Sequence, residues 1–151
     1  MKKALTFIII TVAVCILLFL FLENGNKDSL GVSDLNLVED NMDFAELKIE
    51  TLIEGEGKES KNGDKLVVNY VGTLKDGTQF DSSYSRNESF EFTLGEGRVI
   101  TGWEEGMLGM KIGEKRRLEI PSTYGYGESG AGELIPASSG LIFEVELLEI
   151  K

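Results

Sequence analysis

Hydrophobic residues are arranged in two different ways along this chain. Residues 4–22 form one unbroken, overwhelmingly apolar run without a charged side chain. A helix that rises 1.5 Å per residue would extend this run over roughly 28 Å, which is close to the thickness of the hydrocarbon layer of a membrane. The run therefore predicts a single transmembrane helix near the N-terminus, within an anchor that comprises residues 1–22.

The flanks of this run favour an uncleaved signal anchor. A cleaved signal peptide has a shorter apolar core, followed by small residues at the cleavage site, whereas this run ends at Leu22 and is followed by Glu23. Lys2 and Lys3 precede the run, so the positive-inside rule predicts a cytoplasmic N-terminus and an extracytoplasmic position for the rest of the chain. We expect a single-pass protein of the cell membrane. Secretion after signal cleavage is the alternative.

Residues 23–43 are polar and acidic, with six acidic side chains against Lys27 alone. Segments with an excess of one charge repel themselves and stay solvated. We interpret this segment as a linker between the anchor and a folded domain at residues 44–151.

In the domain, the apolar residues occur in short segments separated by turns. Alternation of apolar and polar residues predicts a half-buried strand at residues 47–53 and another at residues 90–94. Three further apolar segments predict strands at residues 65–73, 115–120 and 141–150. These segments favour an antiparallel sheet.

Two connections complete the predicted architecture. Leu74 to Thr78, with Asp76 and Gly77 at the tip, is typical of a hairpin turn. Residues 99–110 have near-helical apolar spacing and predict one short amphipathic helix. The pattern as a whole predicts an α+β domain.

Composition excludes several kinds of chemistry. The chain has 15 basic and 26 acidic residues and a net charge of −11, which argues against a nucleic-acid partner. It has no histidine, so histidine-based nucleophilic catalysis and histidine metal ligands are excluded. The single cysteine, Cys15, lies inside the apolar run and follows Val14, where a lipoprotein signal would need a small residue. We therefore expect no lipid attachment at Cys15, and a single cysteine excludes a disulfide within the chain. We expect neither a metal nor a cofactor.

Four segments resemble the FKBP-type peptidyl-prolyl cis-trans isomerases. They follow the order and spacing of that family over about residues 44–151, and they are Val67–Ser83, Val99–Met107, Ile120–Gly127 and Leu141–Leu148. The resemblance implies a five-stranded antiparallel sheet, curled as a half-barrel around one short helix.

The resemblance also implies an aromatic pocket between helix and sheet. The residues carried over for catalysis are Tyr70, Phe80, Asp81, Ile100, Trp103, Tyr126 and Phe143, and those carried over for substrate binding are Arg86, Phe90, Val99 and Ile135. By this analogy Trp103 forms the floor under the proline ring, while the Ile100 N–H and the Tyr126 hydroxyl bind carbonyls of the substrate.

The resemblance implies isomerisation of X-Pro bonds, and the composition agrees with this activity. Rotation about a prolyl bond requires no bond cleavage and no proton transfer, because its barrier of about 20 kcal/mol arises from amide resonance. We expect the partners to be unfolded or newly translocated proline-containing polypeptides, the membrane through residues 4–22, and macrolide ligands, and we expect a monomeric domain. A membrane-tethered binding or chaperone module with little turnover is the alternative function.

One departure from the family lies in the loop after Tyr126. Ala131 and Ala137 stand where many relatives have a histidine and a proline. This loop forms the outer lip of the family's pocket, so the departure concerns substrate preference and macrolide affinity more than activity itself.

Overall fold

The computed structural model describes residues 42–151 of the chain. The predicted transmembrane helix and almost all of the acidic linker lie outside these residues. Among residues 42–151, no helix is long and apolar enough to cross a membrane.

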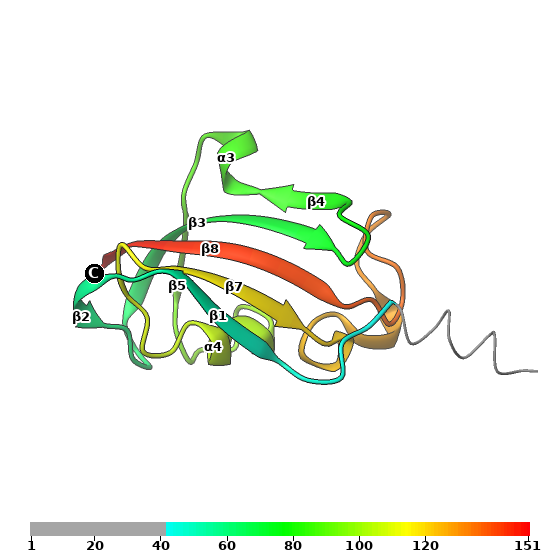
Figure 1. Cartoon of the computed structure of the whole chain (residues 1–151), viewed down its shortest axis with the longest axis horizontal. Coiled ribbons are helices and arrows are strands. Elements are labelled where there is room, and N and C mark those ends of the chain that lie inside the picture. The colour runs from blue at the N-terminus through cyan, green and yellow to red at the C-terminus, as the bar shows by residue number, and fades with distance from the viewer. Residues whose placement is uncertain (1–41) are drawn as a thin grey trace, which may run out of the picture. The chain divides into compact units, whose positions relative to one another are not determined.

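The described chain is built mainly from short strands (Figure 1). In chain order its elements are β1 (Lys48–Ile53), β2 (Glu56–Glu59), β3 (Lys65–Leu74), β4 (Gln79–Ser82), α3 (Ser83–Arg86), β5 (Phe90–Thr93), α4 (Thr101–Gly106), β6 (Lys111–Ile112), β7 (Lys115–Ile120), the 3₁₀ helices η1 (Ser122–Tyr124) and η2 (Gly127–Ser129), and β8 (Leu141–Ile150). All five predicted strands are present, and the hairpin turn predicted at residues 74–78 joins β3 to β4.

The main sheet has six antiparallel strands, in the order β1-β7-β8-β3-β4, with β5 also paired to β3. The expectation of five strands was wrong by one, because β3 is ten residues long and one of its edges accepts two short partners in succession. Residues 71–73 of β3 pair with β4, and residues 65–68 pair with β5. The short helix α3 lies between these two strands in the chain. Strands β2 and β6 form a separate two-stranded sheet.

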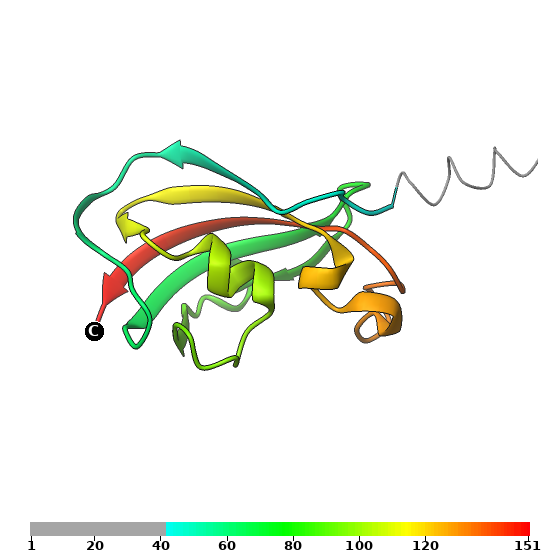
Figure 2. The same cartoon turned by 90° about the horizontal axis from the view of Figure 1, so that it is seen from below.

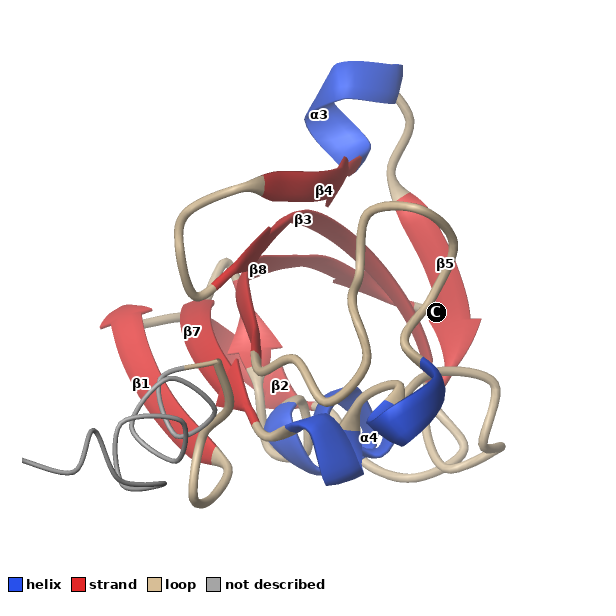
Figure 3. Cartoon of the chain, turned by 90° about the vertical axis from the view of Figure 1, so that its right-hand side faces the viewer, coloured by secondary structure: helices blue, strands red, loops and turns tan. Residues whose placement is uncertain are grey.

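The sheet arches over α4 (Figures 2 and 3). The hydrophobic core fills the space between them. Strand β8 shows how the sequence directs this packing, because every second residue from Leu141 to Leu147 is buried while Glu144 and Glu146 face outward. Each fully buried aliphatic side chain contributes about 1.5–3 kcal/mol relative to an exposed position.

The helix α4 is shorter than the predicted segment of residues 99–110. It begins after Ile100, whose backbone is extended with φ −61° and ψ 151°. Gly102 and Gly106 face β7, and a Cβ atom on Gly102 would lie only 2.5 Å from Ile120 Cγ2. Glycine is a poor helix former. Here its missing side chain allows the helix to lie directly against the sheet.

The prediction of a half-buried first strand was wrong for β1. All six of its residues are exposed, including Ile49 at 44% and Ile53 at 57%. Within the described chain β1 pairs only with β7, so it is an edge strand. Alternation in the sequence indicated a strand, but it could not indicate that no other element covers this one.

Candidate active site

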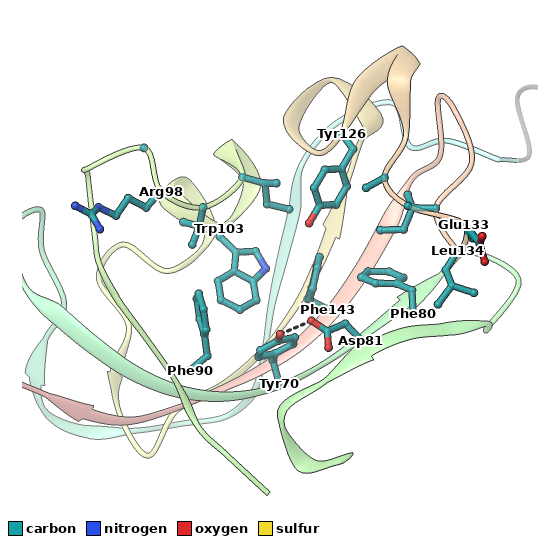
Figure 4. Close-up of a pocket in the computed structure, with 16 residues that line it drawn as sticks. Tyr70, Phe80, Asp81, Phe90, Arg98, Trp103, Tyr126, Glu133, Leu134 and Phe143 are labelled. Atoms are coloured by element: carbon teal, nitrogen blue, oxygen red, sulfur yellow. Dashed lines mark hydrogen bonds between the residues drawn. The ribbon is translucent and has the colours of Figure 1, made fainter. Parts of the chain in front are cut away.

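A pocket of about 580 Å³ lies between the concave face of the sheet and α4 (Figure 4). Its walls come from the sheet, the segment that leads into α4, and the loop that follows η2. The lining residues are Tyr70, Phe80, Asp81, Phe90, Gly97, Arg98, Val99, Ile100, Trp103, Tyr126, Ala131, Gly132, Glu133, Leu134, Ile135 and Phe143.

Trp103 forms the centre of an aromatic cluster at the base of the pocket. Helix α4 carries its indole toward the sheet, where it is 4% exposed. Its ring centroid lies 5.0 Å from that of Tyr70 and 5.2 Å from that of Phe143, with interplanar angles of 84° and 83°. Edge-to-face contacts of this kind stabilise ring pairs beyond simple burial. They also fix the orientation of the indole, so the floor is rigid before any ligand arrives.

Gly72 allows the rings of Phe80 and Phe143, on the sheet side of the pocket, to pack against each other. A Cβ atom at this position of β3 would lie 2.7 Å from the Phe80 ring and 2.8 Å from the Phe143 ring. Without a side chain at Gly72, the two rings pack edge to face with centroids 5.4 Å apart. A glycine in the middle of a strand therefore shapes this side of the pocket.

Tyr70, Asp81 and Arg86 form a hydrogen-bond network at the edge of the pocket. The Tyr70 hydroxyl donates to Asp81 Oδ2, and Arg86 Nη1 forms an ion pair with Asp81 Oδ1. Arg86 Nη2 also donates to the Tyr70 hydroxyl over 2.9 Å. The Ser82 N–H donates to Asp81 Oδ1 over 2.8 Å. Strands β3 and β4 and helix α3 are thus joined through a single carboxylate.

The environment keeps Asp81 ionised and Tyr70 neutral. Burial works to raise the pKa of the Asp81 carboxyl, but hydrogen bonds from Tyr70, Arg86 and Ser82 outweigh it and hold the pKa below its ordinary value. Burial, reinforced by the hydrogen bond to Asp81, raises the pKa of Tyr70 above its ordinary value. Burial, followed by the negative charge of Asp81, likewise raises the pKa of Tyr126. Both phenols therefore remain hydrogen-bond donors at neutral pH.

Three donors that line the pocket have no hydrogen-bond acceptor within residues 42–151. They are the backbone N–H of Ile100, the hydroxyl of Tyr126 and the indole Nε1–H of Trp103. Figure 4 shows the Tyr126 hydroxyl and the Trp103 nitrogen pointing into the pocket. Of these three donors, the Trp103 Nε1–H is fully buried, and buried polar groups are normally paired. The Ile100 N–H and the Tyr126 hydroxyl suit a ligand that brings its own acceptors.

The segment before α4 is held in place by the helix itself. The Glu104 carboxylate accepts hydrogen bonds from the N–H groups of Gly95 and Gly97, over 2.5 and 2.9 Å. These contacts position residues 97–100, which form the wall that carries the Ile100 N–H.

A tight loop forms the outer lip of the pocket. Ala131 and Ile135 pair with each other through two backbone hydrogen bonds of 2.9 and 3.1 Å. Between them, Glu133 and Leu134 are exposed at the tip, with Leu134 at 55%. The lip therefore presents one apolar and one acidic side chain to an incoming ligand.

The structure brings together ten of the eleven expected site residues. Arg86 does not line the main pocket. Instead it pairs with Asp81 and borders a second hollow beside Phe90. Sequence reasoning missed Gly97 and Arg98. It placed the loop after Tyr126, including Ala131, at the outer lip of the pocket, but among residues 131–135 it named only Ile135 as a site residue. Their positions directly before Val99 and before Ile135 could have indicated them. The catalytic and binding roles themselves stay predictions.

The fold and the pocket define a class of protein. An antiparallel sheet arched over one short helix, with an aromatic cleft between them, is the architecture of the prolyl isomerases that the sequence resembles. The family model for FKBP-type peptidyl-prolyl cis-trans isomerases matches residues 56–148 of this chain. The chain belongs to this family.

Several proteins with a name of this family are similar to the chain. FK506-binding protein 1A of Neurospora crassa is 53% identical over 106 residues, which cover 70% of this chain and 88% of that protein. The FK506-binding protein of Neisseria meningitidis serogroup B is 55% identical over 104 residues, covering 69% and 95%. FK506-binding protein 2B of Rhizopus delemar is 61% identical over 95 residues, which cover 62% of this chain but only 46% of that protein.

A solved structure is also similar to this chain. The crystal structure of AtFKBP13 superposes with a TM-score of 0.67 at 34% sequence identity, and covers 74% of this chain and 98% of that one.

Proposed function

We propose that this protein catalyses cis-trans isomerisation of X-Pro bonds in unfolded or newly translocated polypeptides outside the cytoplasm. The observation that carries the proposal is the open aromatic pocket of about 580 Å³, into which unpartnered donors point. The pocket is large enough for a proline ring with its neighbouring peptide groups, and sites for small ligands start at about 300 Å³.

The pocket accelerates rotation by binding the twisted amide better than the planar one. The proline ring lies on the Trp103 indole, and the surrounding rings remove water from the prolyl amide. Loss of water favours the twisted state, because this state has lost the charge separation of amide resonance. No acid, base or nucleophile takes part.

Two fixed donors hold the substrate while the bond rotates. The Ile100 N–H and the Tyr126 hydroxyl bind carbonyl oxygens of the substrate chain. Donors that are already oriented cost no reorganisation when the transition state forms. Asp81 supports the opposite wall by fixing the Tyr70 ring, and its negative charge is balanced by Arg86.

The proposed location of the activity is supported by the sequence of the N-terminal region. The apolar run of residues 4–22 anchors the protein, Lys2 and Lys3 keep the N-terminus in the cytoplasm, and the acidic linker holds the domain on the other side of the membrane. Proline-containing chains that emerge from translocation are the substrates available there.

A prolyl-peptide assay on the full-length chain in mild detergent tests the activity. We expect faster cis-trans exchange of an X-Pro peptide, and we expect a rapamycin-class macrolide to inhibit it by occupying the same pocket. Exchange at the uncatalysed rate together with tight macrolide binding would instead identify a tethered binding module.

A further inference from the structure

The two ends of one pocket wall are held by the same three residues of the chain. This wall is the lip segment (residues 122–140), which carries Tyr126 and the tip of the lip. The three residues are Met42, Asp43 and Phe44, here named the strap. Figure 1 shows the start of the described chain beside this segment, at one end of the domain.

The first end of the lip segment is held by the Asp43 carboxylate. Asp43 Oδ1 accepts from the Ser122 N–H over 2.7 Å, and Oδ2 accepts from the Ser122 hydroxyl over 2.5 Å. Asp43 Oδ1 also accepts from the Phe44 N–H over 2.8 Å. Ser122 is 5% exposed and begins η1. Hydrogen bonds to an ionised acceptor are stronger than neutral ones, so this attachment is a firm one.

The second end is held by the rest of the strap. The Gly140 N–H donates to the Met42 carbonyl over 2.7 Å. The Phe44 ring lies directly on Gly140, where a Cβ atom would be 2.7 Å from Phe44 Cδ2. Gly140 immediately precedes β8, so it is the last residue of the lip segment before the sheet resumes.

The strap also contacts the turn between β3 and β4. Lys75 Nζ donates to the Asp43 carbonyl over 2.7 Å and lies 4.8 Å from the centroid of the Phe44 ring. Lys75 belongs to the turn that leads into β4, the strand of Phe80 and Asp81. The strap therefore contacts both the lip segment and the turn before β4.

Inside the lip segment, the hydrogen bonds connect its residues mainly to one another. Ala131 pairs with Ile135, and the Ser138 N–H donates to the Gly127 carbonyl over 2.8 Å. Such bonds keep the segment compact. Ile135 packs in the hydrophobic core, with Tyr124 and Ala131 against that core, and holds the middle of the segment. The strap supplies the polar attachments at its two ends.

We propose that Asp43 is a positioning residue for the isomerase pocket. Its carboxylate sets the position of the lip segment, and through it the distance of the Tyr126 hydroxyl from the Trp103 floor. The kinetic part of this inference rests on the proposed function, whereas its structural part does not.

Hydrogen exchange tests the structural part on the full-length chain. In Asp43→Ala the amide of Gly140 should exchange about tenfold faster, because loss of the Asp43 carboxylate frees the strap at both ends. Glu114→Ala is the matched control. The Glu114 carboxylate also accepts three hydrogen bonds, from the Lys111 N–H, the Thr51 hydroxyl and Arg116 Nε, but it does not line the pocket. This control should leave Gly140 exchange unchanged once both variants are normalised to global stability.

Steady-state kinetics test the functional part. Asp43→Ala should raise KM about three- to tenfold and leave kcat within about twofold, because a loosely held wall must be ordered at each binding event. Asp43→Asn keeps an oxygen for the Ser122 N–H and should recover most of the affinity. Glu114→Ala should lower the melting temperature without raising KM.

Two results would overturn the proposal. One is unchanged Gly140 exchange in folded Asp43→Ala. The other is an unchanged KM in Asp43→Ala, when this variant is active and its Gly140 amide exchanges faster than in wild type. If Asp43→Ala does not fold, Gly140→Ala decides, because the added methyl group pushes the Phe44 ring away and should raise KM in the same way. If the wild-type chain shows no turnover, the proposed function fails and the exchange experiment still decides the role of Asp43.

Discussion

At the residue scale, the site combines two kinds of polar group. Three hydrogen-bond donors have no partner in the domain, and one carboxylate, Asp81, accepts several hydrogen bonds within it. The Tyr126 hydroxyl, the Ile100 N–H and the Trp103 indole N–H have no acceptor within the described chain. Asp81, in contrast, accepts hydrogen bonds from Tyr70, Ser82 and Arg86. The Tyr126 hydroxyl and the Ile100 N–H are available to a substrate, whereas the indole nitrogen is itself buried in the floor. Asp81 organises the wall that faces the substrate.

Removing the Tyr126 hydroxyl should separate activity from stability. Tyr126→Phe should lower kcat/KM about two- to tenfold, because one hydrogen bond of about 0.5–1.5 kcal/mol to the substrate is lost. The melting temperature should hold, since this hydroxyl has no partner in residues 42–151. Tyr84→Phe is the control. Its hydroxyl donates to Glu146 over 3.1 Å away from the pocket, so activity should not change. Equal activity of Tyr126→Phe and wild type would remove this hydroxyl from the mechanism.

The pH profile of kcat/KM should be flat between pH 5 and 8, because the chain has no histidine and the Asp81 carboxylate titrates below this range. The pKa of Asp81 is lower in the folded domain than in the unfolded chain. The ionised carboxylate therefore stabilises the fold above its ordinary pKa of about 4, and this stabilisation is lost as the pH falls below that value.

Comparison of wild type with Asp81→Asn measures this dependence. Thermal melting as a function of pH should show a stability difference that is constant at neutral pH and shrinks below about pH 4. A difference that instead changes between pH 6 and 8 would contradict the assignment of the titrating group.

At the scale of elements, close approach between α4 and β7 decides where the floor of the pocket lies. Sequence periodicity over residues 99–110 correctly indicated an amphipathic helix, but the helix ends at Gly106. Met107 and Met110 are still fully buried, although they follow the helix. Their inward positions produced the longer prediction, because periodicity reports burial and does not report backbone conformation.

A methyl group at Gly102 should force the helix away from the sheet. Gly102→Ala places Cβ 2.5 Å from Ile120 Cγ2, and we expect a loss of about 1–3 kcal/mol in the free energy of unfolding, measured by denaturant titration. The control is Glu105→Ala at an exposed position of the same helix, where alanine should be neutral or slightly stabilising. Unchanged stability in Gly102→Ala would mean that the helix can move without cost.

At the scale of the whole molecule, the orientation of the proposed anchor can be tested separately from the structure of the domain. The strap places residue 42 beside Gly140, so the linker joins the domain at the end of the lip segment. If the anchor has the orientation that Lys2 and Lys3 indicate, a protease added to intact cells or spheroplasts should digest the domain. Survival of the domain until the membrane is permeabilised would show the opposite orientation. An epitope at the N-terminus, protected in the same cells, is the internal control.

The sequence by itself determined the elements and the chemistry of this protein. Alternation placed two strands, because a half-buried strand requires an apolar residue at every second position. Short apolar segments between turns placed the other three, with β7 and β8 at their observed bounds. The family motifs identified ten of the residues that line the pocket. The absence of histidine limited the reactions that the site can perform.

Only the tertiary structure decided which of these elements are covered and which residues meet. It left β1 exposed at the edge, gave β3 two partners on one side, and placed Arg86 outside the lining of the main pocket. It also brought Asp43 to Ser122 across 79 positions of the chain. Local periodicity reflects the average environment of a residue. A contact between distant segments depends on how the whole chain packs, and no single segment contains that information.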